Sequence, residues 1–556
     1  MPLMEVRRFL AVIAAFALCA VPLHVGASKK TVCTITVNSP DEKDFLARTL
    51  SPGEYQFVEL VERGRPDWLA SACRAGVKCD VLLISGHFDG GTQFYSDRLH
   101  VDEYLPVDEM ERVACSDSCP GLFSQLKEVY LFGCNTLNAE PMRTAGREIE
   151  RSLVRAGYSK ADAASLARVL GVRHAESNRE RMRNVFKDVP LIYGFSSKAP
   201  LGPYAAATLQ KHFQPGVASE FGSGRVNASL LGLFAPVSMT AVGGATDDDP
   251  YAGFRRDVCQ FSDDRLSAAQ KVSFVHQVLR REVAEVRMLF DHVERYANSL
   301  SDAQLRHPAV RKALDAIAAD DASRLKYLEF ARDADEASVR TRMLAVAHRL
   351  GWLTADEHRA EHVRMIAEHL AGTAIGSGEV DLFCAMNKDR ALGEAVRRLP
   401  LPATQSDRVA QAAVLACHGS SQGRARVLRA LIGADDTDIA IAQVLLRHRP
   451  LEDANELRLV ATGITRMHGS DAQVRALDTL ARHHLSDLAT LQELIRLFGL
   501  AKSVNVQRAI AGVLIRADFG PIGRPELARS LRAHRLKSPD GQDLIDVLIR
   551  RLLAAG

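Results

Sequence analysis

The stretch DVLLISGHFDGG, residues 80–91, carries an apolar run up to Ser-Gly-His. A second stretch, EVYLFGCNTLN at residues 128–138, has the same form and carries its apolar run up to Gly-Cys. Short apolar runs that end at glycine are typical of strands buried on both faces, as in a parallel sheet. Ligands of such sheets bind at the carboxyl ends of the strands. If the two strands are neighbours, we expect His87 and Cys134 to lie at one edge of the sheet.

Further apolar runs surround these two. TVCTITV (31–37), YQFVELV (55–61) and VPLIYGFSS (189–197) have the composition of strands, and helical patterns separate them. Strands that alternate with helices predict an α/β domain with a mainly parallel sheet and helices on both faces. We assign residues 28–245 to this domain. Its Arg-rich insertion, residues 140–188, predicts a helix-turn-helix pair with a solvated surface.

After a Gly- and Asp-rich segment, the alternation of strand and helix patterns ends, and we expect a linker at residues 246–260. From residue 261 to 556 helical patterns follow one another. Segments such as HPAVRKALDAIA (307–318) and VNVQRAIAGVLI (504–515) place Val and then Arg or Gln before a stripe of small apolar residues. This pattern resembles the second helix of HEAT-type repeats. The resemblance implies an all-α helical solenoid, because stacked helix pairs bury apolar faces that no pair buries alone. It also implies that this region binds a partner or a substrate.

The beginning of the chain predicts export. Residues 1–27 contain a short basic lead, an apolar run, and small residues at positions 25 and 27. This is the pattern of a secretory signal peptide cut after about Ala27, with no stable membrane span afterwards. We therefore expect a periplasmic or secreted protein. The formal net charge of +3 gives no reason to expect a nucleic-acid partner.

The cysteine count fits an oxidising compartment. Ten cysteines are present, and nine remain once the predicted signal peptide is removed. If Cys134 stays a free thiol, the other eight can form disulfides. Cys115 and Cys119 are close enough in sequence to pair, and so are Cys73 and Cys79, but spacing does not determine the connectivity.

A histidine and a cysteine at one sheet edge suit nucleophilic catalysis. Histidine accepts and returns a proton near neutral pH, and an adjacent imidazole activates a thiol. The backbone amide of a cysteine at the strand end can face a developing oxyanion. Gly86 and Gly133 would let a substrate backbone approach closely.

The paired motifs LLISGHFDG (82–90) and VYLFGCNTL (129–137) resemble those of the caspase-like cysteine peptidases, which include caspases, separases, gingipains, legumains and CHAT proteins. The resemblance implies a caspase-like fold in which His87 is the general base and acid and Cys134 is the nucleophile. Gly86, Phe88 and Gly133 would then supply backbone support for the oxyanion. No cofactor is implied.

The resemblance also implies substrate contacts and processing. Ser196 and Ser197 fall where the family's next strand pairs with an extended substrate. Apart from the resemblance, the acidic Asp89 near the histidine would favour a basic side chain in the substrate. In caspases the segment between these strands is cut, so self-processing within 140–188 is a hypothesis. The family usually has glycine after the histidine, where this chain has Phe88. That departure favours an alternative, a catalytically inactive caspase-fold scaffold.

A competing enzyme class rests on the helical region. His358, Glu361 and His362 have the H-x-x-E-H order of a class of zinc peptidases. The rival interpretation is a charged helix surface, and a zinc-dependent peptidase remains a remote alternative. The leading expectation is an exported cysteine endopeptidase that acts on protein or peptide substrates, with a helical-repeat domain for partner or substrate binding.

Overall fold

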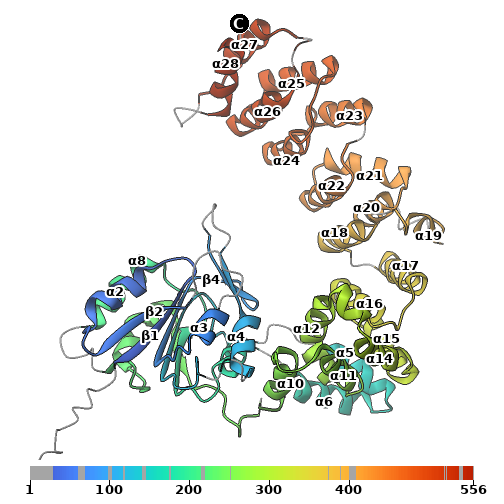
Figure 1. Ribbon diagram of the computed structural model, residues 1–556. Coiled ribbons are helices and arrows are strands. Elements are labelled where there is room, and N and C mark those ends of the chain that lie inside the picture. Colours follow the sequence, from blue (N-terminus) through green and yellow to red (C-terminus); the bar gives the residue numbers. More distant parts are fainter. Residues whose placement is uncertain are drawn as a thin grey trace, which may run out of the picture. The chain divides into compact units, whose positions relative to one another are not determined.

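A computed structural model gives the three-dimensional structure of the chain (Figure 1). It describes residues 29–60, 69–97, 103–116, 119, 121–140, 146–173, 177–213, 220–250, 252–372, 375–387, 390–399, 408–451, 453–518, 520, 522–537 and 543–554. The predicted signal peptide, residues 1–27, lies outside these ranges.

The N-terminal part is built on a six-stranded sheet, as the alternating pattern predicted. Its strands, in spatial order, are β2 (Tyr55–Glu59), β1 (Lys30–Thr36), β3 (Val81–Ser85), β7 (Glu128–Phe132), β8 (Leu191–Phe195) and β9 (Met239–Val242). The first five run parallel, and β9 pairs with β8 antiparallel. Every residue of β3, β7 and β8 is buried, which is why their sequences are almost uniformly apolar.

Helices cover both faces of this sheet. One face packs on α3 (Ala70–Arg74), α4 (Val107–Cys115) and α7 (Asn178–Val185). The other packs on α2 (Asp41–Thr49), α8 (Gly202–His212) and α9 (Ala228–Phe234). Side chains of a strand alternate between the two faces, so Leu82 and Ile84 join the first core while Val81 and Leu83 join the second. The α/β fold class is therefore confirmed for this part of the chain.

A small antiparallel sheet follows β3. It consists of β4 (His87–Phe88), β5 (Gln93–Tyr95) and β6 (Tyr104–Pro106). The histidine thus begins a hairpin at the carboxyl end of the central strand, and Phe88 and Phe94 face the core beneath this hairpin.

The predicted helix pair of the insertion is only partly correct. The described helices are α5 (Gly146–Arg155), α6 (Lys160–Arg173) and α7. Helix α7 is not a solvated surface helix, because its Met182 and Val185 belong to the core of the sheet and its Arg181 is buried. The charged sequence NRERMRNV (178–185) had indicated a solvent-exposed helix.

The chain divides into two compact units between Ser323 and Arg324, later than the linker expected at 246–260. That segment instead leads into helix α10 (Ala252–Ser262), which packs on α4 and is joined to it by a disulfide between Cys115 and Cys259. The remaining helices of the first unit are α11 (Ala268–Leu279), α12 (Val283–Ser299), α13 (Asp302–Arg306) and α14 (Pro308–Ala318).

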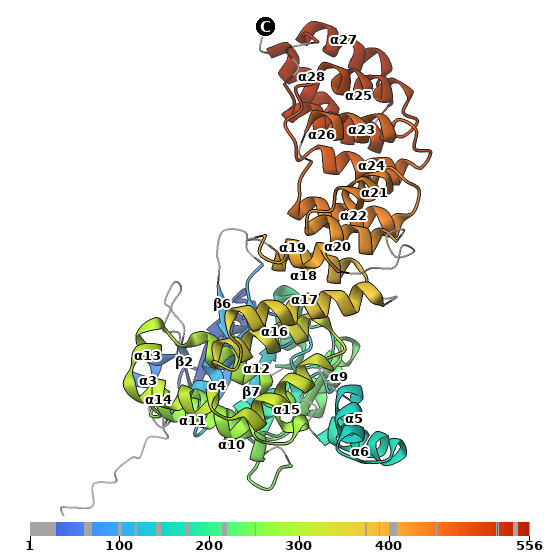
Figure 2. The ribbon, with the colours of Figure 1, turned by 90° about the vertical axis from the view of Figure 1, so that its right-hand side faces the viewer.

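The second unit is helical throughout its described residues (Figure 2). After α15 (Asp321–Arg332), which spans the boundary, its helices are α16 (Ala337–Arg349), α17 (Ala355–Ala371), α18 (Ser377–Met386), α19 (Gly393–Arg397), α20 (Val409–Cys417), α21 (Ser421–Leu431), α22 (Asp436–His448), α23 (Ala454–Ile464), α24 (Ser470–Leu480), α25 (Leu488–Leu500), α26 (Val504–Arg516), α27 (Arg524–His534) and α28 (Leu544–Ala554). Helices α20, α22, α24, α26 and α28 contact one another in succession, and α21, α23, α25 and α27 form a second row. No described helix has the length and apolar character that crossing a membrane requires.

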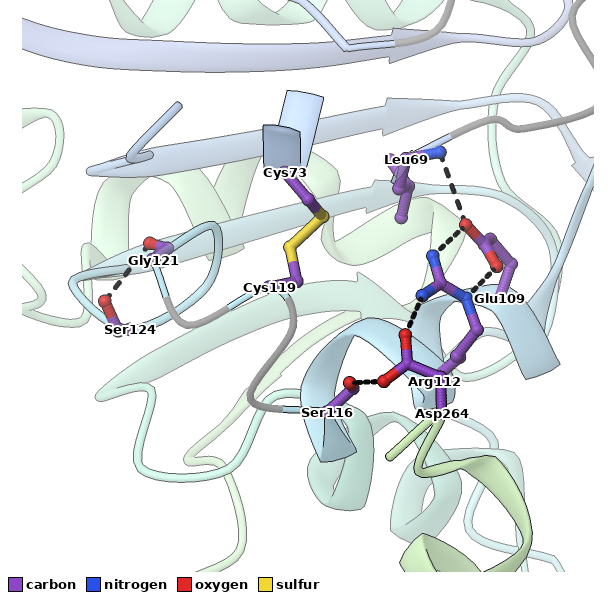
Figure 3. Close-up of a disulfide and its surroundings, with 9 residues drawn as sticks. All are labelled: Leu69, Cys73, Glu109, Arg112, Ser116, Cys119, Gly121, Ser124 and Asp264. Carbon is purple, nitrogen blue, oxygen red and sulfur yellow. Dashed lines mark hydrogen bonds and ion pairs between the residues drawn. A yellow bond between two sulfur atoms is a disulfide. The ribbon is translucent and has the colours of Figure 1, made fainter. Parts of the chain in front are cut away.

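Within the part of the chain that the structure describes, four disulfides join eight cysteines, and Cys134 is free. The pairs are Cys33–Cys79, Cys73–Cys119, Cys115–Cys259 and Cys384–Cys417. Figure 3 shows the second of them. The two pairings suggested by short spacing are wrong, because Cys115 ends α4 facing α10 while Cys119 lies beside α3. The expectation that eight cysteines can pair while Cys134 stays a free thiol is confirmed. The disulfides fit an oxidising compartment.

Candidate functional site

The strands that end in His87 and Cys134 are direct neighbours. Strands β3 and β7 pair in parallel with Ser85 opposite Phe132, and the Gly86 amide donates to the Phe132 carbonyl at 3.1 Å. His87 and Cys134 therefore follow equivalent positions at the same edge of the sheet. Among the described residues no hydrogen bond joins their side chains directly.

Gly133 is required by close packing beneath the hairpin. A Cβ atom at this position would lie 3.0 Å from each of three atoms: the Gly86 carbonyl oxygen, Phe88 Cβ and a ring atom of Phe94. A Cβ at Gly86 would lie 3.0 Å from Val37 Cβ. Gly133 thus lets the histidine hairpin pack directly over the start of the cysteine loop, and Gly86 lets the hairpin pack against Val37.

His87 lies in a partly enclosed position on that hairpin. Its ring packs beside that of Tyr95, with 5.5 Å between the centroids. The buried Nε2 atom lies 3.1 Å from Oδ2 of Asp97, although the carboxylate is off the direction of a hydrogen bond. Asp97 was missed in the sequence because it approaches His87 only through the pairing of β4 with β5. The carboxylate is the acidic group that lies nearest to Nε2 in the ion pairs of His87.

The side chain of Phe88 points into the core, away from the edge. It packs against Phe94 with 4.8 Å between ring centroids and is 5% exposed. Asp89 and Gln93 form a hydrogen-bonded pair across the hairpin, with 3.2 Å between N and O. Because such pairs alternate in an antiparallel ladder, the Phe88 amide points away from β5. Within the described residues this amide has no hydrogen-bond partner.

The thiol of Cys134 is half-buried, and one backbone amide contacts it. The Ala199 N–H, which follows β8, donates to Sγ at 3.3 Å. The Cys134 amide, like that of Phe88, has no partner among the described residues. The backbone N–H groups of Phe88 and Cys134 are therefore two unpaired donors at this edge of the sheet. An oxyanion is stabilised by donors of this kind.

The loop that carries Cys134 is tightly fixed. Asn135 takes the left-handed conformation (φ 59°), and its amide donates to the Ser197 carbonyl at 2.6 Å. Thr136 is fully buried, and its hydroxyl donates to the Gly133 carbonyl and accepts from the Phe195 amide, both at 3.1 Å. The polar pair after the cysteine is thus structural, because it ties the loop to β8.

Ser196 and Ser197 lie beside this loop, at the end of β8. The Ser196 amide donates to the Ser238 carbonyl at 3.1 Å, and its hydroxyl donates to the same oxygen at 3.3 Å. The carbonyl of Ser197 accepts the Asn135 bond, and its side chain is exposed. Ser196 is therefore bonded to the residue before β9, and Ser197 is exposed beside the cysteine loop.

Asp89 closes the turn of the hairpin. Its Oδ1 accepts the amides of Gly91, Thr92 and Gln93 at 3.0, 2.8 and 3.1 Å. Burial would raise the pKa of Asp89, but these hydrogen bonds and one from the Thr92 hydroxyl outweigh it and lower the pKa. The carboxylate serves the turn through local bonds, as is common for aspartate.

The histidines of the zinc hypothesis lie on α17. The His358 and His362 rings are 4.2 Å apart, and His348 stacks on His358 at 4.9 Å. Glu361 is bound to Arg332, with 3.1 Å between Oε2 and Nε. Within the described residues, no group of three or more His, Cys, Asp or Glu side chains is placed to hold a metal ion.

No protein-family model, no curated protein and no solved structure matches this chain.

Proposed function

We propose that the chain is an exported cysteine endopeptidase of the caspase-like type, with Cys134 as nucleophile and His87 as general base and acid. One observation carries the proposal: two adjacent parallel strands end in these residues at the same edge of the sheet. The unpaired amides of Phe88 and Cys134 and the carboxylate of Asp97 add the remaining groups that acyl transfer uses.

The chemistry follows from these groups. His87 takes the proton of the Cys134 thiol, and the thiolate attacks the carbonyl carbon of a peptide bond. The amides of Phe88 and Cys134 donate to the oxyanion of the tetrahedral intermediate. The imidazolium of His87 then gives its proton to the departing amine, which leaves an acyl-enzyme. A water molecule, deprotonated by His87, hydrolyses the thioester and regenerates the thiol.

The packing of Phe88 supports the active form over the inactive scaffold. The family's glycine after the histidine is replaced here, and that replacement was the reason to consider a scaffold. Because the phenyl ring occupies the core, it leaves the edge beside Cys134 unobstructed and its amide unpaired. The helical second unit, with its successive rows of helices, would present substrates or partners as a HEAT-like solenoid.

Thiol reactivity tests the proposal directly. The described cysteines other than Cys134 are all in disulfides, so an alkylating agent reports this one thiol. We expect iodoacetamide at mildly acidic pH to label Cys134 rapidly in the wild type and slowly in His87→Ala, as measured by intact mass and peptide mapping. A Cys134→Ser variant is the control for specificity. Slow labelling that His87→Ala does not change would reject the dyad and favour the scaffold.

A further inference from the structure

Helix α7 is bonded at its beginning to the loop that carries Cys134. The side-chain amide of Asn178 donates to the Asn135 carbonyl at 3.0 Å, and the Arg179 backbone amide donates to the Asn138 carbonyl at 3.0 Å. Asn178 is 4% exposed. The residue directly after the nucleophile is therefore held from this side by α7 and from the other by Ser197.

One turn later, the same helix is bonded to the hairpin that carries His87. The guanidinium of Arg181 donates to the Gly91 carbonyl in the turn of that hairpin. It also pairs with Glu111 at 2.9 Å and with Asp108 at 3.0 Å, both on α4. The side chains of Arg181 and Glu111 are only 6% and 7% exposed. A buried arginine whose donors are shared among three acceptors has little freedom to move.

Asn178 and Arg181 are three positions apart, so they project from one side of the helix. Three residues of an α-helix rise by about 4.5 Å, and this distance varies little in an intact helix. The helix also rests on the core through Met182 and Val185. A single rigid element therefore holds the cysteine loop at one point and the histidine hairpin at another.

We infer that α7 is a clamp that sets the separation of His87 and Cys134, with Asn178 and Arg181 as its positioning residues. The inference rests on the proposed function, because a separation matters only if the two side chains act together. Neither residue touches the reacting atoms. Each acts through the loop or the turn to which it is bonded, so its loss misplaces the dyad without removing a reacting group.

The clamp also extends to the helical part of the first unit. Asp108, which accepts from Arg181, pairs with Arg295 on α12 at 2.8 Å, and Arg295 contacts the buried His292 at 2.9 Å. The ion pairs of Arg181 therefore continue through Asp108 to Arg295 on α12.

Alkylation of Cys134 in matched variants tests the clamp. Asn178→Ala removes the bond to the cysteine loop, and Arg181→Lys keeps the charge but cannot reach all three acceptors. Ser177→Ala is the control, because the Ser177 hydroxyl caps α7 by accepting the Glu180 amide at 3.2 Å and holds neither loop. We expect the labelling rate to fall about tenfold in Asn178→Ala and Arg181→Lys, because a misplacement of about 1 Å costs up to about a hundredfold and these variants should shift the dyad by less. The labelling rate of Ser177→Ala should fall much less. Each variant is measured at the same number of degrees below its own melting temperature.

Hydrogen exchange separates the two arms of the clamp and does not depend on activity. Asn178→Ala should increase amide exchange in residues 134–138, and Arg181→Lys should increase it in residues 87–95. If His87→Ala lowers the labelling rate but Asn178→Ala behaves like Ser177→Ala, the dyad stands and the clamp is rejected. If His87→Ala has no effect, the proposed function and the clamp fall together.

Discussion

The Nε2 atom of His87 lies 3.1 Å from the Oδ2 atom of Asp97, at the end of the hairpin that follows the central strand. The nitrogen is buried, whereas the carboxylate is 66% exposed. An acidic neighbour on this side leaves the other ring nitrogen, Nδ1, without a hydrogen bond among the described residues. The imidazole thus has a carboxylate beside Nε2, and neither ring nitrogen forms a hydrogen bond among the described residues.

Replacement of Asp97 should slow the reaction of Cys134. In Asp97→Asn the imidazolium loses a charged neighbour, so we expect alkylation about fivefold slower at mildly acidic pH, because partly exposed ion pairs contribute about 1 kcal/mol. Asp97→Glu should restore most of the rate. Rates of labelling measured from pH 5 to pH 8 check this. Equal labelling rates for the wild type, Asp97→Asn and Asp97→Glu would show that Asp97 has no effect on the reactivity of Cys134.

Phe88 should prove to be a packing residue. The variant Phe88→Gly introduces the glycine that caspase-like peptidases usually have, and it removes a buried ring from its contacts with Phe94 and the core. We expect the free energy of unfolding to fall by about 3–5 kcal/mol, the usual cost of deleting a buried aromatic side chain. Urea denaturation followed by far-UV circular dichroism measures this. A stable variant with faster labelling of Cys134 would instead mean that the ring obstructs the site.

Acid should destabilise the second unit through His362. Burial, with smaller contributions from His358 and Arg340, lowers the pKa of His362 to about 4. An unfolded histidine titrates near 6.5, so between pH 6.5 and pH 4 only the unfolded chain gains the proton. The free energy of unfolding therefore falls as the pH drops through this window, by roughly 2–3 kcal/mol in total.

The variant His362→Phe isolates this contribution, because it keeps a ring beside His358 and cannot titrate. Denaturant unfolding at several pH values between 4 and 7 should show a shallower loss of stability in the variant than in the wild type. Parallel curves for the two proteins would contradict the assignment to His362.

The disulfide between Cys115 and Cys259 should hold helix α10 against α4. The loop that it closes is long, with a sequence separation of 144, and removal of such a bond costs about 2–5 kcal/mol. We expect the double variant Cys115→Ser/Cys259→Ser to unfold at lower denaturant concentration and to become sensitive to protease near residues 246–262. A matched double variant at Cys384 and Cys417, in the second unit, should leave this region resistant. Rapid cleavage there in the wild type would restore the linker interpretation.

The sequence predicted what depends on local composition. The uniformly apolar runs of β3 and β7 indicated buried parallel strands, and the odd cysteine count was compatible with a free Cys134. It could not predict contacts that depend on distant partners. Arg181 lies in a segment that looks solvent-exposed, and it is buried only because Glu111 and Asp108 approach it from 70 and 73 positions away. Asp97 approaches His87 only through the register of the hairpin. The Cys73–Cys119 and Cys115–Cys259 disulfides form only because α3, α4 and α10 pack together.

The parallel sheet also separates two kinds of sulfur chemistry. Cys79 precedes β3 and is oxidised, whereas Cys134 follows β7 and is reduced. Strands of five residues place their two ends roughly 17 Å apart, far beyond the reach of thiol–disulfide exchange. Nine cysteines can form four pairs in roughly 945 ways, since any of the nine can be omitted and the other eight pair in 105 ways. The sheet therefore acts as a spacer during oxidative folding: once it has formed, the free thiol of Cys134 cannot reach the Cys33–Cys79 disulfide.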